Sequence, residues 1–159
     1  MLPSRAKRLK QSPQKSLESN MDRGRRIAFD YGDARIGVAI CDPDGILATP
    51  LPFLDSRHPK VFREIASLLD EFQPIVIYLG LPKHLSGSDG ESVEKVRAFA
   101  TKLGEITNLP ITYIDERMST VGAQKKLHEA GKSAKDSRSL IDSMSAVAIL
   151  ESGLLHENK

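Results

Sequence analysis

Acidic side chains stand at the ends of apolar segments, where they could do chemistry. Asp30 closes a strand-like segment at residues 25–31, and Asp115 and Glu116 close a second one. Asp142 lies in an otherwise apolar segment near the C-terminus. Burying a carboxylate without a counter-charge costs several kcal/mol, so carboxylates that cluster need cations or protons beside them.

Bound divalent cations would meet this need. Oxygen ligands alone suit Mg²⁺ or Mn²⁺, and two such ions about 4 Å apart can activate a water molecule and stabilise the leaving oxygen of a phosphodiester. If the acids at the two strand ends and the acid of the C-terminal segment converge, a metal-dependent phosphodiester hydrolase is the favoured interpretation.

Each acid taken singly also has a structural explanation. Asp30 could form an ion pair with Arg35 or Arg117. Asp115 could cap a turn, and Asp142 could be an acid at a helix N-terminus. The three acids taken together favour the metal site, because Asp142 would otherwise be a charge on an apolar helix.

The elements that would position these acids follow from the apolar pattern. Alternating or continuous apolar and β-branched residues, separated by turn-prone sequences such as "GDA" and "DPDG", predict strands. The predicted strands are residues 25–31, 35–42, 46–54, 74–80 and 110–117. Apolar residues at a spacing of three and four predict helices. The predicted helices are residues 58–72, 88–106, 119–131 and 139–155.

This order predicts an α/β fold with one mixed five-stranded sheet. Three antiparallel strands come first, helix-linked parallel strands follow, and helices cover both faces. If the first and fifth strands are parallel neighbours, Asp30 and Asp115 lie at the same edge of the sheet. The last helix could deliver Asp142 to the same point, since Ala146 and Ile149 on the same helix face are expected to meet the sheet.

Length and composition bound the class of protein. A chain of 159 residues with 40% apolar residues is one domain with a buried core. No apolar run approaches the roughly 20 residues of a membrane helix and no signal peptide is recognisable, so we expect a soluble, intracellular protein with no membrane partner. The single cysteine, Cys41, excludes an internal disulfide and fits a small core residue in a reducing compartment.

Positive charge is concentrated at the N-terminus. Residues 1–26 contain eight Lys or Arg and two acids, a net charge of +6, whereas the remaining 133 residues contain 15 basic and 19 acidic groups, a net charge of −4. Residues 1–24 have almost no periodic apolar residues, which predicts a disordered basic tail before a folded domain at 25–155. Such a tail could be a solubilising extension or a tether to RNA or DNA phosphates.

Basic residues near the acids are candidate contacts to a nucleic acid backbone. Lys83 follows the fourth strand and could hold a phosphate or be a solvated surface lysine. Arg117 follows the acids of the fifth strand and could clamp a phosphate or brace Asp30. A further basic run leads to Asp142 and could be a substrate path or a solvated face. Its members are Lys125, Lys126, Lys132, Lys135 and Arg138.

Other functional classes lack support in the sequence. There is no G-x-S-x-G element, no P-loop, and no metal-ligand spacing among the four histidines. Tryptophan is absent and aromatic residues make up 5% of the chain, which argues against recognition of single strands by base stacking. We expect contacts to the backbone of a duplex or of structured RNA instead.

Four motifs carry a resemblance to a known family. In order and spacing, "DYGDARIGVA", "LGLPKHLSGS", "DERMST" and "IDSMSAVAIL" resemble the motifs of the YqgF-type (RuvX) family of pre-16S ribosomal RNA nucleases. That family has an RNase H-like fold and is related to Holliday-junction resolvases. The match covers about residues 25–153. The chain departs from the wider RNase H-like pattern at the end of the fourth strand, which reads "YLGLP" without a carboxylate.

The resemblance implies roles for individual acids. Asp30 corresponds to the catalytic acid of the first strand. Asp115 or Glu116 corresponds to the catalytic acid of the "DER" motif, and Asp142 to that of the last helix. Asp30, Glu116 and Asp142 would hold the metal. Either Glu116 fills the ligand role that the fourth strand leaves open, or the site holds one metal less firmly.

The resemblance also implies a substrate. The protein would be a cytoplasmic, divalent-metal-dependent nuclease that processes the 5′ end of pre-16S rRNA in ribosome biogenesis. Alternatives are a resolvase of branched DNA and a non-catalytic nucleic-acid-binding factor in ribosome assembly or transcription. A homodimer stays open, because resolvases of junctions need two sites and this chain offers one. Gly32 and Gly37 would let substrate or a neighbouring strand approach closely, or would serve turn chemistry.

Overall fold

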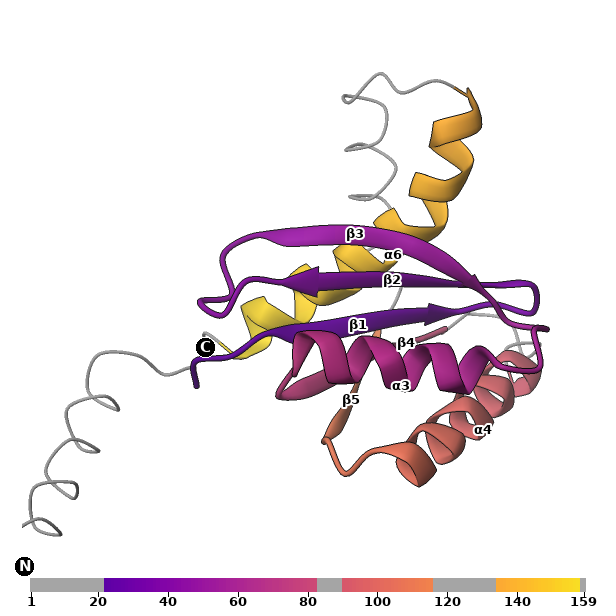
Figure 1. Cartoon of the computed structure of the whole chain (residues 1–159), viewed down its shortest axis with the longest axis horizontal. Helices are drawn as coiled ribbons and strands as arrows, with labels where there is room; N and C mark the ends of the chain where they lie inside the picture. The colour runs from indigo at the N-terminus through magenta and orange to yellow at the C-terminus, as the bar shows by residue number, and fades with distance from the viewer. Residues whose placement is uncertain (1–21, 83–89, 116–133, 158–159) are drawn as a thin grey trace, which may run out of the picture.

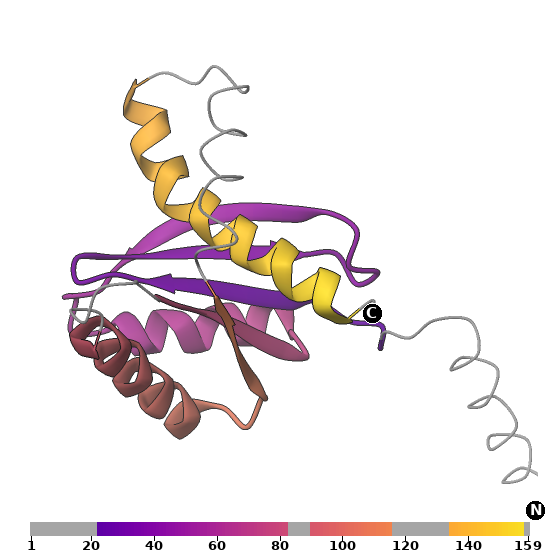
Figure 2. The same cartoon turned by 180° about the vertical axis from the view of Figure 1, so that it is seen from behind.

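The computed structural model describes residues 22–82, 90–115 and 134–157, with 134–142 described by their backbone alone. These residues form a mixed five-stranded sheet with two helices on one face and one long helix on the other, as Figure 1 and the reverse view in Figure 2 show. The predicted α/β architecture, with three antiparallel strands followed by helix-linked parallel strands, is therefore confirmed.

The five strands lie in the order β3-β2-β1-β4-β5 across the sheet. The first three pair antiparallel, and the last two join the sheet parallel to β1. Their bounds are β1 Arg26–Tyr31, β2 Arg35–Cys41, β3 Ala48–Asp55, β4 Val76–Leu81 and β5 Ile111–Asp115.

The predicted adjacency of the first and fifth strands is wrong, because β4 lies between them. Phe29 of β1 pairs with Leu79 of β4, which in turn pairs with Tyr113 of β5. The continuously apolar β4 must be covered on both faces, and it is covered because it lies between β1 and β5, its two parallel neighbours, in the interior of the sheet. All three strands still run in the same direction, so their carboxyl ends share one edge of the sheet.

The third strand begins two residues later than predicted, because Ile46 and Leu47 belong to a turn. The Asp42 carboxylate accepts hydrogen bonds from the backbone N–H groups of Asp44 at 3.0 Å, Ile46 at 2.8 Å and Leu47 at 2.6 Å. An aspartate whose carboxylate accepts hydrogen bonds from backbone N–H groups of the following residues stabilises a turn relative to a continuing strand.

Two helices cover one face of the sheet. The helix α3 spans Val61–Phe72 and begins three residues later than predicted, and α4 spans Gly90–Ile106. Their buried residues recur at a spacing of three or four and pack with β1, β2 and β4 in one apolar cluster. These buried helix residues are Val61, Ile65, Leu69, Val96, Phe99 and Leu103.

The opposite face is covered by α6, Ala134–Glu157, which begins five residues earlier than predicted. It crosses β3, β2 and β1, and its small and apolar residues pack on Ala28, Ala39 and Cys41 of the sheet. Burial of Cys41 confirms its predicted core role. Among the described helices, none combines the length and apolar composition that crossing a membrane requires. The predicted helix 119–131 lies outside the described residues.

A buried ion pair ties the end of α6 to the start of the sheet. The Arg26 guanidinium is fully buried and donates from Nε to Glu157 Oε2 at 3.2 Å and from Nη2 to Glu157 Oε1 at 2.7 Å. The sequence groups Arg26 with the basic N-terminus, but the structure makes it part of the core. Residues 1–21 of the predicted basic tail lie outside the described part of the chain.

Candidate functional site

The acid at the end of β1 lies on the sheet face that α6 covers. Asp30 is two residues beyond Ala28, which is fully buried in the cluster beneath α6. Side chains alternate between the faces of a strand, so Asp30 belongs to the same face as Ala28. Asp30 itself is half-buried, so its carboxylate lies where the core meets the carboxyl edge of the sheet.

Glycines flank Asp30 on both neighbouring strands. Asp30 pairs with Gly37 of β2. On β4, Gly80 comes one residue after Leu79, the partner of Phe29, and so lies at the level of Asp30. Neither neighbouring strand therefore places a side chain directly opposite this carboxylate, and glycine at such a position permits the close approach of another group. This favours the prediction of close approach at Gly37.

An irregularity in the sheet occurs next to Gly37. Ile36 pairs with Leu54, but Val38 pairs with Leu51, so β3 carries one extra residue opposite Gly37. Such bulges bend the strand and increase its local twist, and they are frequent beside functional sites. The extra residue of β3 therefore lies opposite the β2 residue that faces Asp30.

The other described acid, Asp115, belongs to the opposite face. Its neighbour Ile114 is buried in the cluster beneath α6, whereas Tyr113 lies under the Arg97 guanidinium of α4, 5.8 Å from the ring centre. Strand alternation puts Asp115 with Tyr113, on the α3 and α4 side. The strands of Asp30 and Asp115 are also two spacings apart, or about 10 Å. The sheet therefore separates these two predicted catalytic acids.

The helix segment that contains Asp142 is attached to the sheet by its neighbour. Ser143 is buried, and its hydroxyl donates a hydrogen bond to the Leu51 carbonyl of β3. Ala146 and Ile149 are fully buried, which confirms that this helix face meets the sheet. Position 142 is four and seven residues before them, and so shares their face.

Gly32 serves the turn between β1 and β2. The Ser56 hydroxyl donates to the Gly32 carbonyl at 2.6 Å, and a Cβ atom at Gly32 would lie 2.8 Å from the Arg35 carbonyl oxygen. A side chain would therefore collide with the turn backbone. Of the two explanations that the sequence leaves open for Gly32, this contact favours turn chemistry.

The remaining predicted site residues cannot be placed from the described part of the chain. Within that part, no group of three or more His, Cys, Asp or Glu side chains could hold a metal ion. Outside it lie Lys83, Glu116, Arg117, Lys125, Lys126 and Lys132. The backbone of α6 includes the positions, but not described side chains, of Lys135, Arg138 and Asp142.

Two contributors to this region were missed by sequence reasoning. Gly80 belongs to "YLGLP". The missing carboxylate of this segment was noted from the sequence, but no role was assigned to its glycine. Ser143 was one small residue in an apolar helix, and its bond to β3 depends on how the helix crosses the sheet. A glycine at the end of a buried strand is the signal that could have identified Gly80.

The arrangement defines a class of fold found in a known resolvase. The chain is similar to the solved structure of Thermus thermophilus RuvC in complex with a Holliday junction substrate, with a TM-score of 0.51 and 14% sequence identity over 84% of this chain and 95% of that one. At that identity the likeness concerns the fold, which is that of the RNase H-like resolvases.

Residues 24–156 match the family described as "RuvX: Holliday junction resolvase". The chain belongs to this RuvX family. It is 49% identical to a Streptomyces avermitilis protein over 86% of this chain and 89% of that one, and 47% identical to a Streptomyces coelicolor protein over 86% and 83%. Both relatives carry the name "Putative pre-16S rRNA nuclease". The resemblance identified from the four sequence motifs is thereby confirmed.

Proposed function

We propose that this protein hydrolyses phosphodiester bonds and processes the 5′ end of pre-16S rRNA in the cytoplasm, as a step of ribosome biogenesis. The observation that carries this proposal is Asp30, a half-buried carboxylate between Gly37 and Gly80 on the sheet face packed by α6. The names of the relatives at 49% and 47% identity support pre-16S rRNA as the substrate.

The donor set fits a hard divalent cation. Asp30 offers carboxylate oxygens, the ligand type that Mg²⁺ or Mn²⁺ prefers, and the residue directly opposite it on β2 is a glycine, which has no side chain to compete with a ligand. Asp30, Glu116 and Asp142 are the residues that would hold such ions. When bound, the ions would supply Lewis-acid activation of water and neutralise charge on the phosphate.

Glu116 is a better partner for Asp30 than Asp115. Asp115 belongs to the α3 and α4 face of β5, as its neighbours Tyr113 and Ile114 indicate. Asp30 belongs to the α6 face. We therefore assign the metal-ligand role of the "DER" motif to Glu116, and we expect Asp115 to contribute less to catalysis.

The basic residues would bind the substrate backbone. We propose that Lys83 and Arg117 contact phosphates near the acids, and that the basic tail at residues 1–24 adds salt-dependent affinity. The basic run before Asp142 would guide the strand toward the site. Its members are Lys125, Lys126, Lys132, Lys135 and Arg138.

A second candidate function is the resolution of branched DNA. It is favoured by the fold, which resembles a resolvase solved with its junction, and by the description of the matched family. Symmetric cutting of a four-way junction would require two sites, and hence a homodimer of this chain. We rank it second because the two similar Streptomyces relatives carry the rRNA name.

A cleavage assay on two substrates tests the proposal. Purified protein is incubated with a labelled 5′ precursor fragment of 16S rRNA and with a four-way DNA junction, in Mg²⁺, in Mn²⁺ and in EDTA. We expect metal-dependent cutting of the rRNA fragment that disappears with Asp142→Asn, while binding of the fragment is retained. Cutting of the junction alone would establish the second candidate. Binding without cutting in every metal would overturn both and favour a non-catalytic factor.

A further inference from the structure

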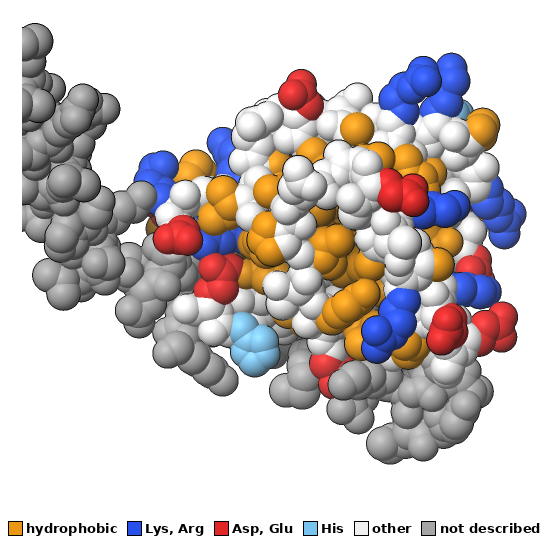
Figure 3. All heavy atoms as spheres, turned by 90° about the horizontal axis from the view of Figure 1, so that it is seen from below, with side chains coloured by type: hydrophobic (Ala, Val, Ile, Leu, Met, Phe, Trp, Pro, Cys, Tyr) orange, Lys and Arg blue, Asp and Glu red, His pale blue; other side chains and the backbone are white. Residues whose placement is uncertain are grey.

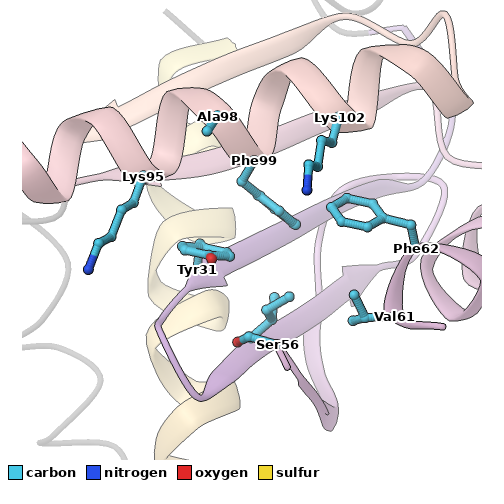
Figure 4. A pocket seen from close by; sticks show the side chains of 9 residues that line it. Tyr31, Ser56, Val61, Phe62, Lys95, Ala98, Phe99 and Lys102 are labelled. Carbon is cyan, nitrogen blue, oxygen red and sulfur yellow. The ribbon is translucent and has the colours of Figure 1, made fainter. Parts of the chain in front are cut away.

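A pocket lies on the sheet face opposite to the proposed metal site. It has a volume of about 180 Å³ and opens between α4, the start of α3 and the carboxyl end of β1, as Figure 4 shows. Hydrophobic side chains fill the middle of this face of the molecule, with both basic and acidic side chains around them (Figure 3). The residues that matter for its chemistry are Tyr31, Ser56, Phe62, Lys95, Phe99 and Lys102.

Aromatic rings form the walls of this pocket. The Tyr31 and Phe99 rings are 4.8 Å apart and inclined by 31°, and the Phe62 and Phe99 rings are 5.7 Å apart and inclined by 42°. Phe99 is buried, whereas Tyr31 and Phe62 are half-buried and keep part of their surface accessible. Three of the eight aromatic residues of the chain therefore meet at one place, although the sequence as a whole is poor in aromatics.

Two lysines stand on the same side of α4 as Phe99. Lys95, Phe99 and Lys102 are four and three residues apart, a spacing that places them on one helix face. Figure 4 shows the Lys102 side chain directed toward the Phe62 and Phe99 rings, whereas the Lys95 side chain lies at the edge of the pocket and extends away from the rings. The Lys102 ammonium lies 5.6 Å from the centre of the Phe62 ring. The pocket thus combines π surfaces with positive charge.

Lys95 can exchange its present carboxylate partners for a phosphate. Its ammonium forms exposed ion pairs with Asp33 at 3.1 Å and with Glu91 at 3.6 Å. Exposed pairs of this kind contribute at most about 1 kcal/mol, so an arriving phosphate can compete with the two carboxylates. Within the described residues Lys102 forms no ion pair, so a phosphate that binds it displaces no carboxylate there.

The pocket adjoins the proposed site through the backbone of β1. Tyr31 directly follows Asp30, and their side chains point to opposite faces of the sheet. A nucleic acid strand that passes the carboxyl edge at Asp30 can therefore reach the pocket by turning around that edge. The volume of 180 Å³ is smaller than the roughly 300–1,000 Å³ of sites that hold complete drug-sized ligands, and it suits one planar ring.

We propose that this pocket receives one unpaired nucleobase of the strand bound at Asp30, with Lys102 and Lys95 contacting the adjacent phosphates. Bases stack on aromatic side chains irrespective of sequence, and lysines provide backbone contacts, so the pocket selects for an unpaired nucleotide rather than for a base identity. This inference rests on the proposed function only in its choice of ligand. It adds a preference for substrates with a single-stranded nucleotide beside a duplex.

A fluorescent base tests the proposal in the absence of catalysis. An RNA hairpin with one unpaired 2-aminopurine next to the duplex end is titrated with wild-type protein in EDTA, and stacking is read as quenching. Ala98 lines the pocket and is exposed on α4, so Ala98→Leu fills the space without removing a charge. We expect this variant to lose most of the quenching and to bind the hairpin about tenfold more weakly.

Charge variants on the same helix provide the matched comparison. Lys102→Gln should weaken binding and reduce the salt dependence by about one phosphate contact. Arg97→Gln removes the same charge from α4 beside Tyr113, outside the pocket, and should leave the quenching unchanged. Thermal unfolding of each variant shows whether it is folded. If Ala98→Leu does not fold, the comparison of Lys102→Gln with Arg97→Gln is the test of the proposal.

Three results would overturn the proposal: full quenching with Ala98→Leu, equal losses with Lys102→Gln and Arg97→Gln, or displacement of the hairpin by an equal concentration of free mononucleotide. The last would make the pocket a site for free nucleotides instead. Failure of the nuclease proposal is distinguishable, because it would appear as absent cleavage in Mg²⁺ and Mn²⁺ while the quenching in EDTA persists.

Discussion

Asp30 of β1 and Gly37 of β2 face each other directly across the antiparallel pair, so no side chain of β2 stands directly opposite the carboxylate. Gly80 produces the same opening on β4. A pair of glycines around a half-buried acid weakens the sheet, since glycine gains nothing from cross-strand packing. The arrangement is explained if the space serves a ligand of Asp30.

Filling that space is expected to impair activity more than stability. In Gly37→Ala a methyl group would stand beside Asp30. Substitution of groups next to metal ligands typically lowers metal affinity or activity by about 10- to 100-fold. We expect at least a tenfold loss of cleavage rate and a higher Mg²⁺ requirement, measured as rate against Mg²⁺ concentration. Gly104→Ala is the control, because a Cβ atom there has no neighbour within 4 Å. Equal rates for Gly37→Ala and wild type would contradict the role assigned to this opening.

The ion pair between Arg26 and Glu157 is expected to stabilise the fold. Glu157→Gln leaves a fully buried guanidinium with a neutral partner, and we expect a loss of about 2 kcal/mol in the free energy of unfolding. Urea unfolding measures this loss. The exposed pair of Arg23 and Asp44, 3.1 Å apart, is the comparison, and Asp44→Asn should cost less than about 0.5 kcal/mol. Similar losses for the two variants would show that burial of Arg26 is unimportant.

Substitution of Gly153 by alanine is expected to lower stability, whereas the same substitution at an ordinary helical glycine raises it. A Cβ atom there would lie 2.5 to 2.7 Å from three atoms of the buried Tyr78 ring. We expect Gly153→Ala to destabilise the protein by about 1–3 kcal/mol through overpacking, whereas Gly104→Ala should stabilise it by up to about 1 kcal/mol. Thermal unfolding distinguishes the signs, and stabilisation by both substitutions would disprove the close packing of α6 on Tyr78.

The turn after β2 is expected to make stability depend on pH in the acid range. The backbone N–H groups of Leu47, Ile46 and Asp44 hold the pKa of the Asp42 carboxyl below its usual value. An unfolded aspartate has a pKa of about 3.9, so the unfolded state binds the proton first, and this stabilisation is present above pH 4 and disappears as the pH falls through the folded pKa. Urea unfolding of wild type and Asp42→Asn should therefore differ at about pH 6 and converge toward about pH 3. A constant difference would contradict the assignment.

The sequence was sufficient to predict the strands and the described helices, but not which strands lie next to each other in the sheet. Local patterns predicted all five strands and the described helices, because alternation and helical spacing are properties of short segments. The placement of β4 between β1 and β5 depends on which strand needs cover on both faces, a property of the assembled sheet. The burial of Arg26 was missed for the same reason, since its partner Glu157 is 131 residues away.

The candidate site shows the same division. Asp30 and the helix face of Asp142 were predictable, because each depends on strand ends or on spacing within one helix. The separation of Asp115 from Asp30 required the register of three strands, which no local pattern contains. The aromatic pocket was missed because composition averages over the chain, although the spacing of Lys95, Phe99 and Lys102 on one helix face was visible.

The most direct test of the account is the cleavage rate of Asp30→Asn on the labelled 16S precursor fragment in Mg²⁺, with binding of the fragment measured in parallel. The substitution keeps the size of the side chain and removes the charge that would hold the cation. We predict loss of cleavage by at least about 100-fold with nearly unchanged binding of RNA. Cleavage by Asp30→Asn at the wild-type rate would contradict the central claim that this carboxylate organises a metal-dependent nuclease site.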